Sequence, residues 1–350
     1  AFEVVEGVGV HRIPALRLPK MSITFNYPWI NWTFFPSNQK KIMAIVEDFK
    51  PDILHLHNHM FDLAFSAARV KRKTKIPLVT TLHTVIRHSS SFYNLFLLPL
   101  DRTFLKNAVL DYSDQVLCPD QNIVLYAKEI FKRKDPVIVP YGIDVGEIDF
   151  DSVKQIKKKY KLEGKRVILS LGHIHKIRDR KDLVQALPLV LKEFPNTVLL
   201  LIGAVSTEVP IQLAKKLGVE DALIFCGPIE HKQIPDFLYL SDMEAHWLNQ
   251  EEPERTSLGI ASLESMYSGK TILSAANPDT YGKGILQDGE NLIIVKTGDP
   301  DSLANTIIDL LKDDKKRERI GNNASKTISE NFLWDSVCEK TLNVYKSVIN

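Results

Sequence analysis

The chain has 350 residues, more than one hydrophobic core usually supports, so two domains are expected. A hydrophobic fraction of 44% and a charged fraction of 25% are those of an ordinary globular protein, and a net charge of +2 excludes a strongly basic nucleic-acid-binding protein. Residues 1–100 are the basic part, with 12 Lys and Arg against 6 Asp and Glu, which favours contact with an anionic surface.

Three widely spaced cysteines, Cys118, Cys226 and Cys338, form no CxxC pattern and predict reduced thiols. No segment is long and apolar enough to span a bilayer, and no signal-peptide pattern opens the chain. We therefore expect a cytoplasmic protein. Peripheral contact with the inner face of the membrane stays open as an alternative.

The first 60 residues hold three local features. Val8–Ile13 reads as a strand at the very start, so upstream residues of the first domain are expected to be missing. Residues 25–35 are unusually aromatic and precede Lys40 and Lys41, which suits either a membrane interface with a lipid-linked acceptor or an aromatic core. His55, His57 and His59 alternate along a strand, and either a strand-end polar cluster or a zinc site fits this spacing.

Short apolar strings alternate with amphipathic helical stretches such as 182–194, 208–217 and 302–311. The strings are continuous rather than alternating, as in parallel strands covered on both faces. The strands predicted in this way are 53–57, 78–82, 115–118, 137–139, 167–171, 197–202, 222–226, 271–274 and 292–295. This order predicts an α/β protein with doubly wound parallel sheets.

The sequence Pro140-Tyr141-Gly142-Ile143-Asp144 ends a strand in a turn, followed by a charged helix at 152–160 and a new strand. We therefore expect Rossmann-like domains at 1–140, incomplete, and 141–330, with a terminal segment at 331–350. In two such domains that face each other across a cleft, ligands bind beyond the carboxyl ends of the strands.

Residues 257–270 predict a loop that becomes a helix, with Ser257 as N-cap and Gly269 at its end. The start of such a helix offers backbone amides to an anion, and Glu264 can accept hydrogen bonds from sugar hydroxyls. A nucleotide or phosphorylated-sugar site and an ordinary core helix with one solvated Glu both fit these residues.

These motifs resemble those of retaining GT-B glycosyltransferases, in the glycosyl transferases group 1 family, often called family 4. Residues 140–144 are similar to the family's interdomain P-N-G-[IV]-D turn. Gly172-His173 with Arg178 and Lys181 is similar to the G-R-x-x-x-x-K-G loop that holds the donor diphosphate. Residues 257–260 with Glu264 resemble the second half of the E-x7-E element.

Motifs at the two ends of the chain agree with this resemblance. Residues 52–57, D-I-L-H-L-H, are similar to D-V-V-H-x-H, and residues 81–84, T-L-H-T, to T-x-H-[TD]. Trp334 matches the aromatic residue that opens a terminal helix crossing back to the first domain. The family's opening strand and glycine-rich loop are absent from this chain.

The resemblance implies a hexosyltransferase of glycan biosynthesis that moves a sugar from a nucleotide sugar to a carbohydrate or lipid-linked acceptor. We expect transfer with retention of the configuration at the sugar. We expect no metal ion, no cofactor and no nucleic-acid partner. Peripheral membrane contact would use the basic, aromatic N-terminal domain. The alternatives are a noncatalytic sugar-nucleotide-binding subunit of the same fold and a sugar-nucleotide epimerase.

The residue roles implied for catalysis fall on His83, near the donor sugar, and on Arg178 and Lys181, as cations at the diphosphate. Lys176 is the substitute cation if the loop register differs.

Donor-binding roles fall on the two phosphate-side motifs, at Gly172, His173, Thr256, Ser257, Leu258, Gly259 and Glu264. Among them Glu264 would bind the ribose, and the amides of Leu258 and Gly259 the diphosphate. Thr256 stands where the family has the first Glu of E-x7-E, with Glu254 as the alternative carboxylate. His173, Arg178 and Asp179 replace the family's Arg, Lys and Gly.

Overall fold

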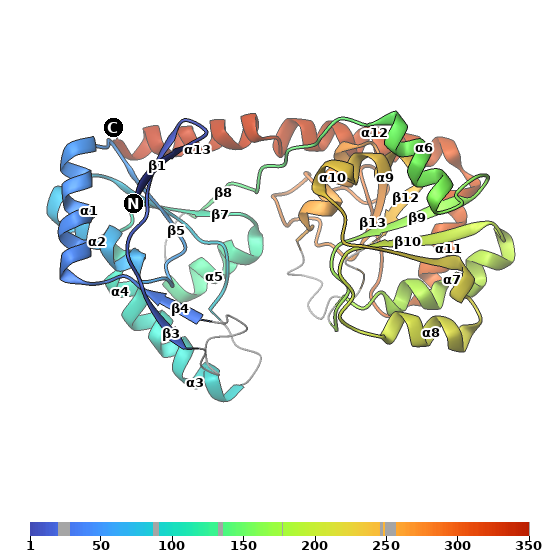
Figure 1. The fold of residues 1–350 in the computed structure, drawn as a ribbon, viewed down its shortest axis with the longest axis horizontal. Coiled ribbons are helices and arrows are strands. Elements are labelled where there is room, and N and C mark those ends of the chain that lie inside the picture. The colour runs from blue at the N-terminus through green and yellow to red at the C-terminus, as the bar shows by residue number, and fades with distance from the viewer. Residues whose placement is uncertain are drawn as a thin grey trace. The chain divides into compact units, whose positions relative to one another are not determined.

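The computed structural model describes residues 1–19, 29–86, 91–131, 136–176, 178–245, 248 and 257–349. The chain divides into two compact units (Figure 1). Unit 1 comprises Ala1–Val139 and Lys340–Asn350, and unit 2 comprises Pro140–Glu339. Each unit contains one parallel sheet with helices, so the predicted α/β architecture is confirmed.

Unit 2 is built on a six-stranded sheet in the order β11-β10-β9-β12-β13-β14, and all its pairings are parallel. Its strands are β9 (Arg166–Leu171), β10 (Thr197–Ile202), β11 (Leu223–Gly227), β12 (Met243–Ala245), β13 (Thr271–Ser274) and β14 (Ile293–Ile294). The chain leaves β9 toward β10 on one side and later places β12 on the other. This reversal between β9 and β12 is a topological switch point, where α/β sheets bind ligands.

Helices cover both faces of the unit 2 sheet. The helices of unit 2 are α6 (Phe150–Lys159), α7 (Lys181–Glu193), α8 (Val209–Leu217), α9 (Ile234–Leu240), α10 (Ile260–Tyr267), α11 (Pro300–Lys312), α12 (Asp314–Asn331) and α13 (Trp334–Ile349), and the last residues of α13 belong to unit 1. Short 3-10 turns lie at Glu220–Ala222 and His231–Gln233.

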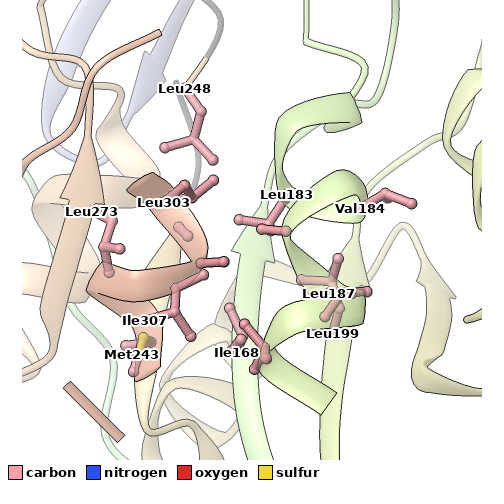
Figure 2. Packing of buried hydrophobic residues seen from close by; sticks show 14 of the residues in the cluster. Ile168, Leu183, Val184, Leu187, Leu199, Met243, Leu248, Leu273, Leu303 and Ile307 are labelled. Atoms are coloured by element: carbon pink, nitrogen blue, oxygen red, sulfur yellow. The ribbon is translucent and has the colours of Figure 1, made fainter. Parts of the chain in front are cut away.

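Alternate residues of the central strands enter two different cores. Ile168 and Leu199 pack with residues of α7 and α11, as Figure 2 shows, whereas Val167 and Val198 pack with residues of α6 and α9. Both faces are therefore buried, which explains the continuous apolar strings of the sequence.

Unit 1 has a smaller, four-stranded parallel sheet in the order β5-β6-β7-β8. Its strands are β5 (Leu54–His57), β6 (Leu78–Thr81), β7 (Gln115–Cys118) and β8 (Val137–Ile138). Two antiparallel pairs stand apart from this sheet, namely β1 (Phe2–Val5) with β2 (Val8–His11) and β3 (Leu16–Pro19) with β4 (Trp29–Trp32). The predicted first strand is thus half of a separate hairpin.

The helices of unit 1 are shorter and more varied. They are α1 (Pro36–Phe49), α2 (Leu63–Thr74), α3 (Ser91–Pro99), a π-helical segment η1 (Leu100–Leu105), α4 (Lys106–Ala108), a 3-10 turn η2 (Leu110–Tyr112) and α5 (Gln121–Phe131). None of the helices within the described ranges is both long and apolar enough to cross a membrane.

One strand of the switch point was missed by the sequence analysis. β12 has only three residues, and the charged Glu244 at its centre interrupts the apolar pattern, although the whole strand is buried. The other strands of the two parallel sheets lie within about a residue of their predicted positions, whereas β1, β3 and β4 were not predicted.

Candidate functional site

The carboxyl end of β9 is joined closely to the loop after β10. Gly172 donates its amide to Ile202 at 2.9 Å, and a Cβ on Gly203 would lie 2.4 Å from the carbonyl oxygen of Gly172. Gly203 has φ +133°, and Gly172 has φ +107°. This contact needs glycine at position 203, because a side chain would collide with backbone and adopt an unfavourable conformation.

The loop after β9 is organised by a buried arginine. Arg180 donates from Nε to Ser170 Oγ at 2.8 Å and from Nη1 to the Arg178 carbonyl at 2.8 Å. Its Nη2 donates to the carbonyls of Leu171, at 3.1 Å, and Gly172, at 3.2 Å. Burial lowers the pKa of Arg180 to about 10, and the nearby Glu244 carboxylate opposes this shift. The guanidinium is thus committed to shaping the loop.

Glu244 brings the second side of the switch point into the same network. It is fully buried on β12, and Ser262 in the first turn of α10 donates to its Oε2 at 3.4 Å. The charges of Arg180 and Glu244 attract each other across the β9–β12 boundary. Buried polar and charged groups therefore connect the loop after β9 to the start of α10.

The predicted cations of this loop have different surroundings. Arg178 is half-buried, and desolvation lowers its pKa. Lys181 is exposed as the first residue of α7, and its amide donates to Asp179 Oδ1 at 3.1 Å. Lys176 is also exposed. Asp179, in place of the family's glycine, thus satisfies an amide at the start of α7.

His173 lies exposed at the end of β9, and its Nδ1 accepts a hydrogen bond from the Ala204 amide at 3.2 Å. The ring is therefore tied to the loop after β10, on the same side as the Gly172–Gly203 contact.

The helix that carries Glu264 begins later than predicted. Gly259, not Ser257, is the N-cap of α10, and it makes no side-chain cap hydrogen bond. The prediction of Ser257 as N-cap is therefore wrong, because the loop stays extended through Gly259. Leu258 packs its side chain into a core cluster, and Thr256 and Glu254 lie outside the described residues.

Glu264 is nearly buried, yet its carboxylate has an exposed partner. His231 Nε2 lies 2.7 Å from Glu264 Oε1, and the side chain of His231 is 69% exposed. His231 stands on the 3-10 turn that follows β11. A ligand that replaces this imidazole would find a carboxylate held in place by the helix.

The carboxyl ends of β5 and β6 in unit 1 carry three histidines in contact. The rings of His55 and His57 stack with centroids 4.4 Å apart, and His57 Nδ1 lies 2.8 Å from His83 Nε2. His55 Nδ1 also lies 2.5 Å from Tyr345 Oη of α13, and His55 Nε2 2.7 Å from Thr81 Oγ1.

These three imidazoles are held neutral. Burial, then the charges of His57 and His83, lowers the pKa of His55 to about 4. Burial also lowers the pKa of His57 and of His83. A neutral imidazole can donate and accept, so each ring can hydrogen bond to a hydroxyl without carrying charge.

His59 is separate from the other histidines. It lies beyond β5 in a fully buried position, with Nε2 2.9 Å from Asp101 Oδ1, and Tyr126 donates to the other oxygen of Asp101. Within the described parts of the chain, no group of three or more His, Cys, Asp or Glu is placed to hold a metal ion.

The aromatic segment 25–35 is described only in part. Residues 25–28 lie outside the described residues, and Phe34 packs edge-on against Phe65 of α2, with ring centroids 5.9 Å apart. At least this residue joins the packing of unit 1.

Two family models match the chain. The one described as Glycosyl transferases group 1 matches residues 152–327, and the one described as Glycosyltransferase Family 4 matches residues 5–147. The chain belongs to the glycosyl transferases group 1 family. The predicted family is therefore confirmed.

Relatives of this glycosyltransferase cover most of its length. The N-acetyl-alpha-D-glucosaminyl L-malate synthase of Bacillus anthracis is 24% identical over 320 residues, which are 88% of this chain and 78% of that protein. An uncharacterized glycosyltransferase of Methanocaldococcus jannaschii is 26% identical over 360 residues, 99% of this chain and 86% of that protein.

Solved structures share the fold of this glycosyltransferase. A glycosyltransferase of Rickettsia africae has a TM-score of 0.72 at 17% identity and covers 91% of this chain and 83% of its own. Anabaena HepE in complex with UDP has a TM-score of 0.70 at 18% identity, and the match covers 89% of this chain and 82% of the HepE chain. The predicted GT-B architecture agrees with both.

Three residues of the glycosyltransferase site were not singled out from the sequence, namely Arg180, Glu244 and His231. Glu244 could have been noticed as a carboxylate between the apolar residues Met243 and Ala245, and Arg180 as one of several cations in its loop. Nothing in the sequence marks His231, since its role depends on the approach of the turn after β11 to α10.

Proposed function

We propose that this glycosyltransferase moves a sugar from a nucleoside diphosphate donor to an acceptor with retention, and that it needs no divalent metal ion. The observation that carries the proposal is the connection across the switch point. Arg180, Glu244 and Ser262 connect the cationic loop after β9 to the N-terminus of α10, the end of a helix that offers backbone amides to an anion.

Cleavage of a sugar–diphosphate bond leaves negative charge on the departing phosphate. Groups fixed before the reaction stabilise this charge at the least cost, because they need not reorganise. We assign this role to the Arg178 guanidinium, with Lys181 at the same loop, and to the amides around Gly259. These groups supply the positive charge that a metal ion supplies in other transferases.

For the nucleoside we assign Glu264, whose carboxylate would accept from the two ribose hydroxyls, with His231 beside it. UDP sugars are the first donors to test, because the structure of Anabaena HepE contains UDP. In unit 1 we assign His83, neutral at physiological pH, to hydrogen bonding with the reacting sugar. A carbohydrate or lipid-linked acceptor fits the basic character of residues 1–100.

The donor is identified by the nucleotide sugar that raises the melting temperature. A ligand at a free concentration of about 100 times its dissociation constant adds about 2.7 kcal/mol to the free energy of unfolding. Transfer is then followed with that donor, with and without a chelator. A loss of most activity on chelation that manganese or magnesium restores would refute the metal-independent mechanism. Interconversion of the donor without an acceptor would indicate an epimerase, and binding without turnover a noncatalytic subunit.

The nucleotide assignment has its own test. Glu264→Ala removes charge-assisted hydrogen bonds worth roughly 1.5 to 3 kcal/mol each before water competes, so affinity for the nucleoside diphosphate should fall at least about tenfold. Isothermal titration measures this change. Glu230→Ala is the matched control, because Glu230 is an exposed carboxylate next to His231 that pairs with Lys232. Equal affinities of the two variants would mean that the nucleotide binds elsewhere.

A further inference from the structure

One helix of unit 1 exposes an apolar stripe. Phe92, Leu95 and Phe96 of α3 and Leu100 and Phe104 of η1 recur at the spacing of one helix face, and they are 44% to 70% exposed. The opposite face is apolar as well, since Leu97 and Leu105 pack into a core cluster with Ile86. Several large apolar side chains exposed side by side usually mark an interaction site.

The stripe continues into a groove of about 570 Å³ between α2 and the η1–α4 segment. Phe65, Ala68, Arg69 and Arg72 of α2 form one wall, at the spacing of one helix face. The other wall is formed by Thr103, Phe104, Asn107 and Ala108, with Phe34 and Tyr112 completing the lining. Phe104 thus belongs to both the apolar stripe and this arginine groove.

The arginine groove is positively charged without compensation. Its lining contains Arg69 and Arg72 and no carboxylate. In the described parts of the chain, neither arginine forms an ion pair, and Arg72 lies over the ring of Tyr112 with its guanidinium carbon 5.4 Å from the ring centroid. A neighbouring cavity of about 430 Å³ shares Arg69 and adds Lys40 and Lys73, against one carboxylate, Glu47.

We propose that unit 1 docks on an anionic lipid bilayer through the apolar stripe and the arginine groove. The stripe enters the boundary between headgroups and acyl chains, where phenylalanine and leucine side chains are favoured. The two guanidiniums bind lipid phosphates, whose geometry suits bidentate hydrogen bonding.

The charge decides between a bilayer and a second copy of this chain. A symmetric dimer through this face would place the arginines of two copies in the same interface, and like charges there oppose association. An anionic bilayer satisfies both the apolar and the cationic parts of the surface. The docking surface adds to the proposed sugar transfer without depending on it, because vesicle binding is measured with no donor present.

Vesicle flotation tests the docking surface directly. The full chain should bind vesicles of phosphatidylcholine with phosphatidylglycerol, bind phosphatidylcholine alone much less, and release as salt is raised. Arg69→Gln with Arg72→Gln should weaken binding about 25-fold, since each basic residue near an anionic surface accounts for about a fivefold change. Phe92→Ser with Phe96→Ser should weaken binding at least about tenfold, because apolar insertion is lost.

Matched control variants separate this surface from general charge and hydrophobicity. Phe49→Ser changes another exposed phenylalanine of unit 1, and Lys41→Gln with Lys128→Gln removes two exposed cations outside the groove. Both controls should bind vesicles like the parent chain. All variants should keep the thermal unfolding profile of the parent chain, which shows that unit 1 still folds.

Three results would overturn the proposal. The first is vesicle binding that the arginine or phenylalanine changes leave intact. The second is binding of soluble glycerol phosphate in the groove with no binding to vesicles, which would indicate a site for a free phosphate. The third is a dimer in sedimentation equilibrium that Phe92→Ser with Phe96→Ser dissociates, again with no vesicle binding.

Discussion

At the carboxyl end of the unit 2 sheet, a guanidinium and a carboxylate, Arg180 and Glu244, are buried among strands and loops. At the carboxyl end of the unit 1 sheet, the corresponding places are taken by the partly exposed, neutral rings of His57 and His83. One sheet end is thus fixed by buried charge, and the other carries groups that can exchange their hydrogen bonds.

The difference reflects what each sheet end can tolerate. Buried charges keep their position because leaving one of them unpaired costs several kcal/mol, roughly 3 to 5 in measured cases. Neutral imidazoles impose no such penalty and can turn toward water or a hydroxyl. The sheet end of unit 2 is therefore held in one arrangement, whereas the sheet end of unit 1 can change its hydrogen-bond partners.

The rigid side of the comparison is tested most strongly at Gly203. Gly203→Ala should lower the free energy of unfolding of unit 2 by about 4 kcal/mol, because overpacking costs about 1 to 3 kcal/mol and a left-handed backbone adds about 1 to 2. Urea denaturation of the full chain measures the loss, and hydrogen exchange at β9 and β10 locates it.

Gly218→Ala is the matched control for this change. Gly218 ends α8 with φ +67° and has open space where a Cβ would stand, so only the backbone penalty of about 1 kcal/mol applies. Equal losses for the two variants would show that the contact with Gly172 carries no constraint.

The buried charge pair should give the next largest effect. Glu244→Gln removes the larger of the two negative charges that favour the buried Arg180 guanidinium, leaving Asp179, and should lower the free energy of unfolding by about 3 kcal/mol. Arg180→Met with Glu244→Leu should recover much of this loss while nucleotide affinity stays reduced, because the loop after β9 loses its organising hydrogen bonds. Urea denaturation and nucleotide titration of the same variants separate the two effects.

An exposed ion pair supplies the control. Asp151→Asn removes the partner of Lys154 on the surface of α6 and should change stability by no more than about 0.5 kcal/mol. If Glu244→Gln costs as little as this surface change, the rigid description of unit 2 fails.

The adjustable side of the comparison predicts a pH dependence. Because the folded pKa of His55 is about 4 against an ordinary 6.5, the unfolded chain takes up its proton first as the pH falls. The stability is full above about pH 6.5 and declines toward pH 4, by about 2 kcal/mol after allowance for partial exposure. Melting temperatures between pH 4 and pH 7.5 should show this decline.

His55→Gln should flatten the decline, because glutamine does not titrate and can replace one of the hydrogen bonds to Thr81 and Tyr345. His11→Gln, on the exposed hairpin of β1 and β2, should leave the pH profile of the parent unchanged. A His55→Gln profile as steep as the parent's would assign the decline to other groups.

Local sequence patterns were sufficient to predict most strands of the two parallel sheets. The predicted ends of β7, β10 and β13 coincide with the observed ones, because polar residues or turn formers precede these strands and their apolar residues are buried. β12 could not be predicted in this way. Its central Glu244 is stabilised by Arg180, which is distant in sequence, and no local pattern reports such a partner.

The candidate site was likewise predictable only where it depends on local sequence. The α10 helix was predictable from its composition, but its start at Gly259 depends on how far the preceding loop remains extended. Arg178, Arg180 and Lys181 look alike in sequence. In the structure Arg180 has a left-handed backbone, with φ +61°, and a buried side chain, whereas Lys181 is exposed, and nothing in the sequence distinguishes them.

The discontinuity of unit 1 has a consequence for synthesis on the ribosome. Tyr345, the partner of His55, is translated only after all of unit 2, Pro140–Glu339, has left the peptidyl transferase centre. At roughly 5 to 20 residues per second, that segment takes about 10 to 40 s. Unit 2 can complete its fold within one continuous stretch of chain during this time. The nascent unit 1 must wait with the Nδ1 of His55 lacking Tyr345, so it is the later-maturing half although it emerges first.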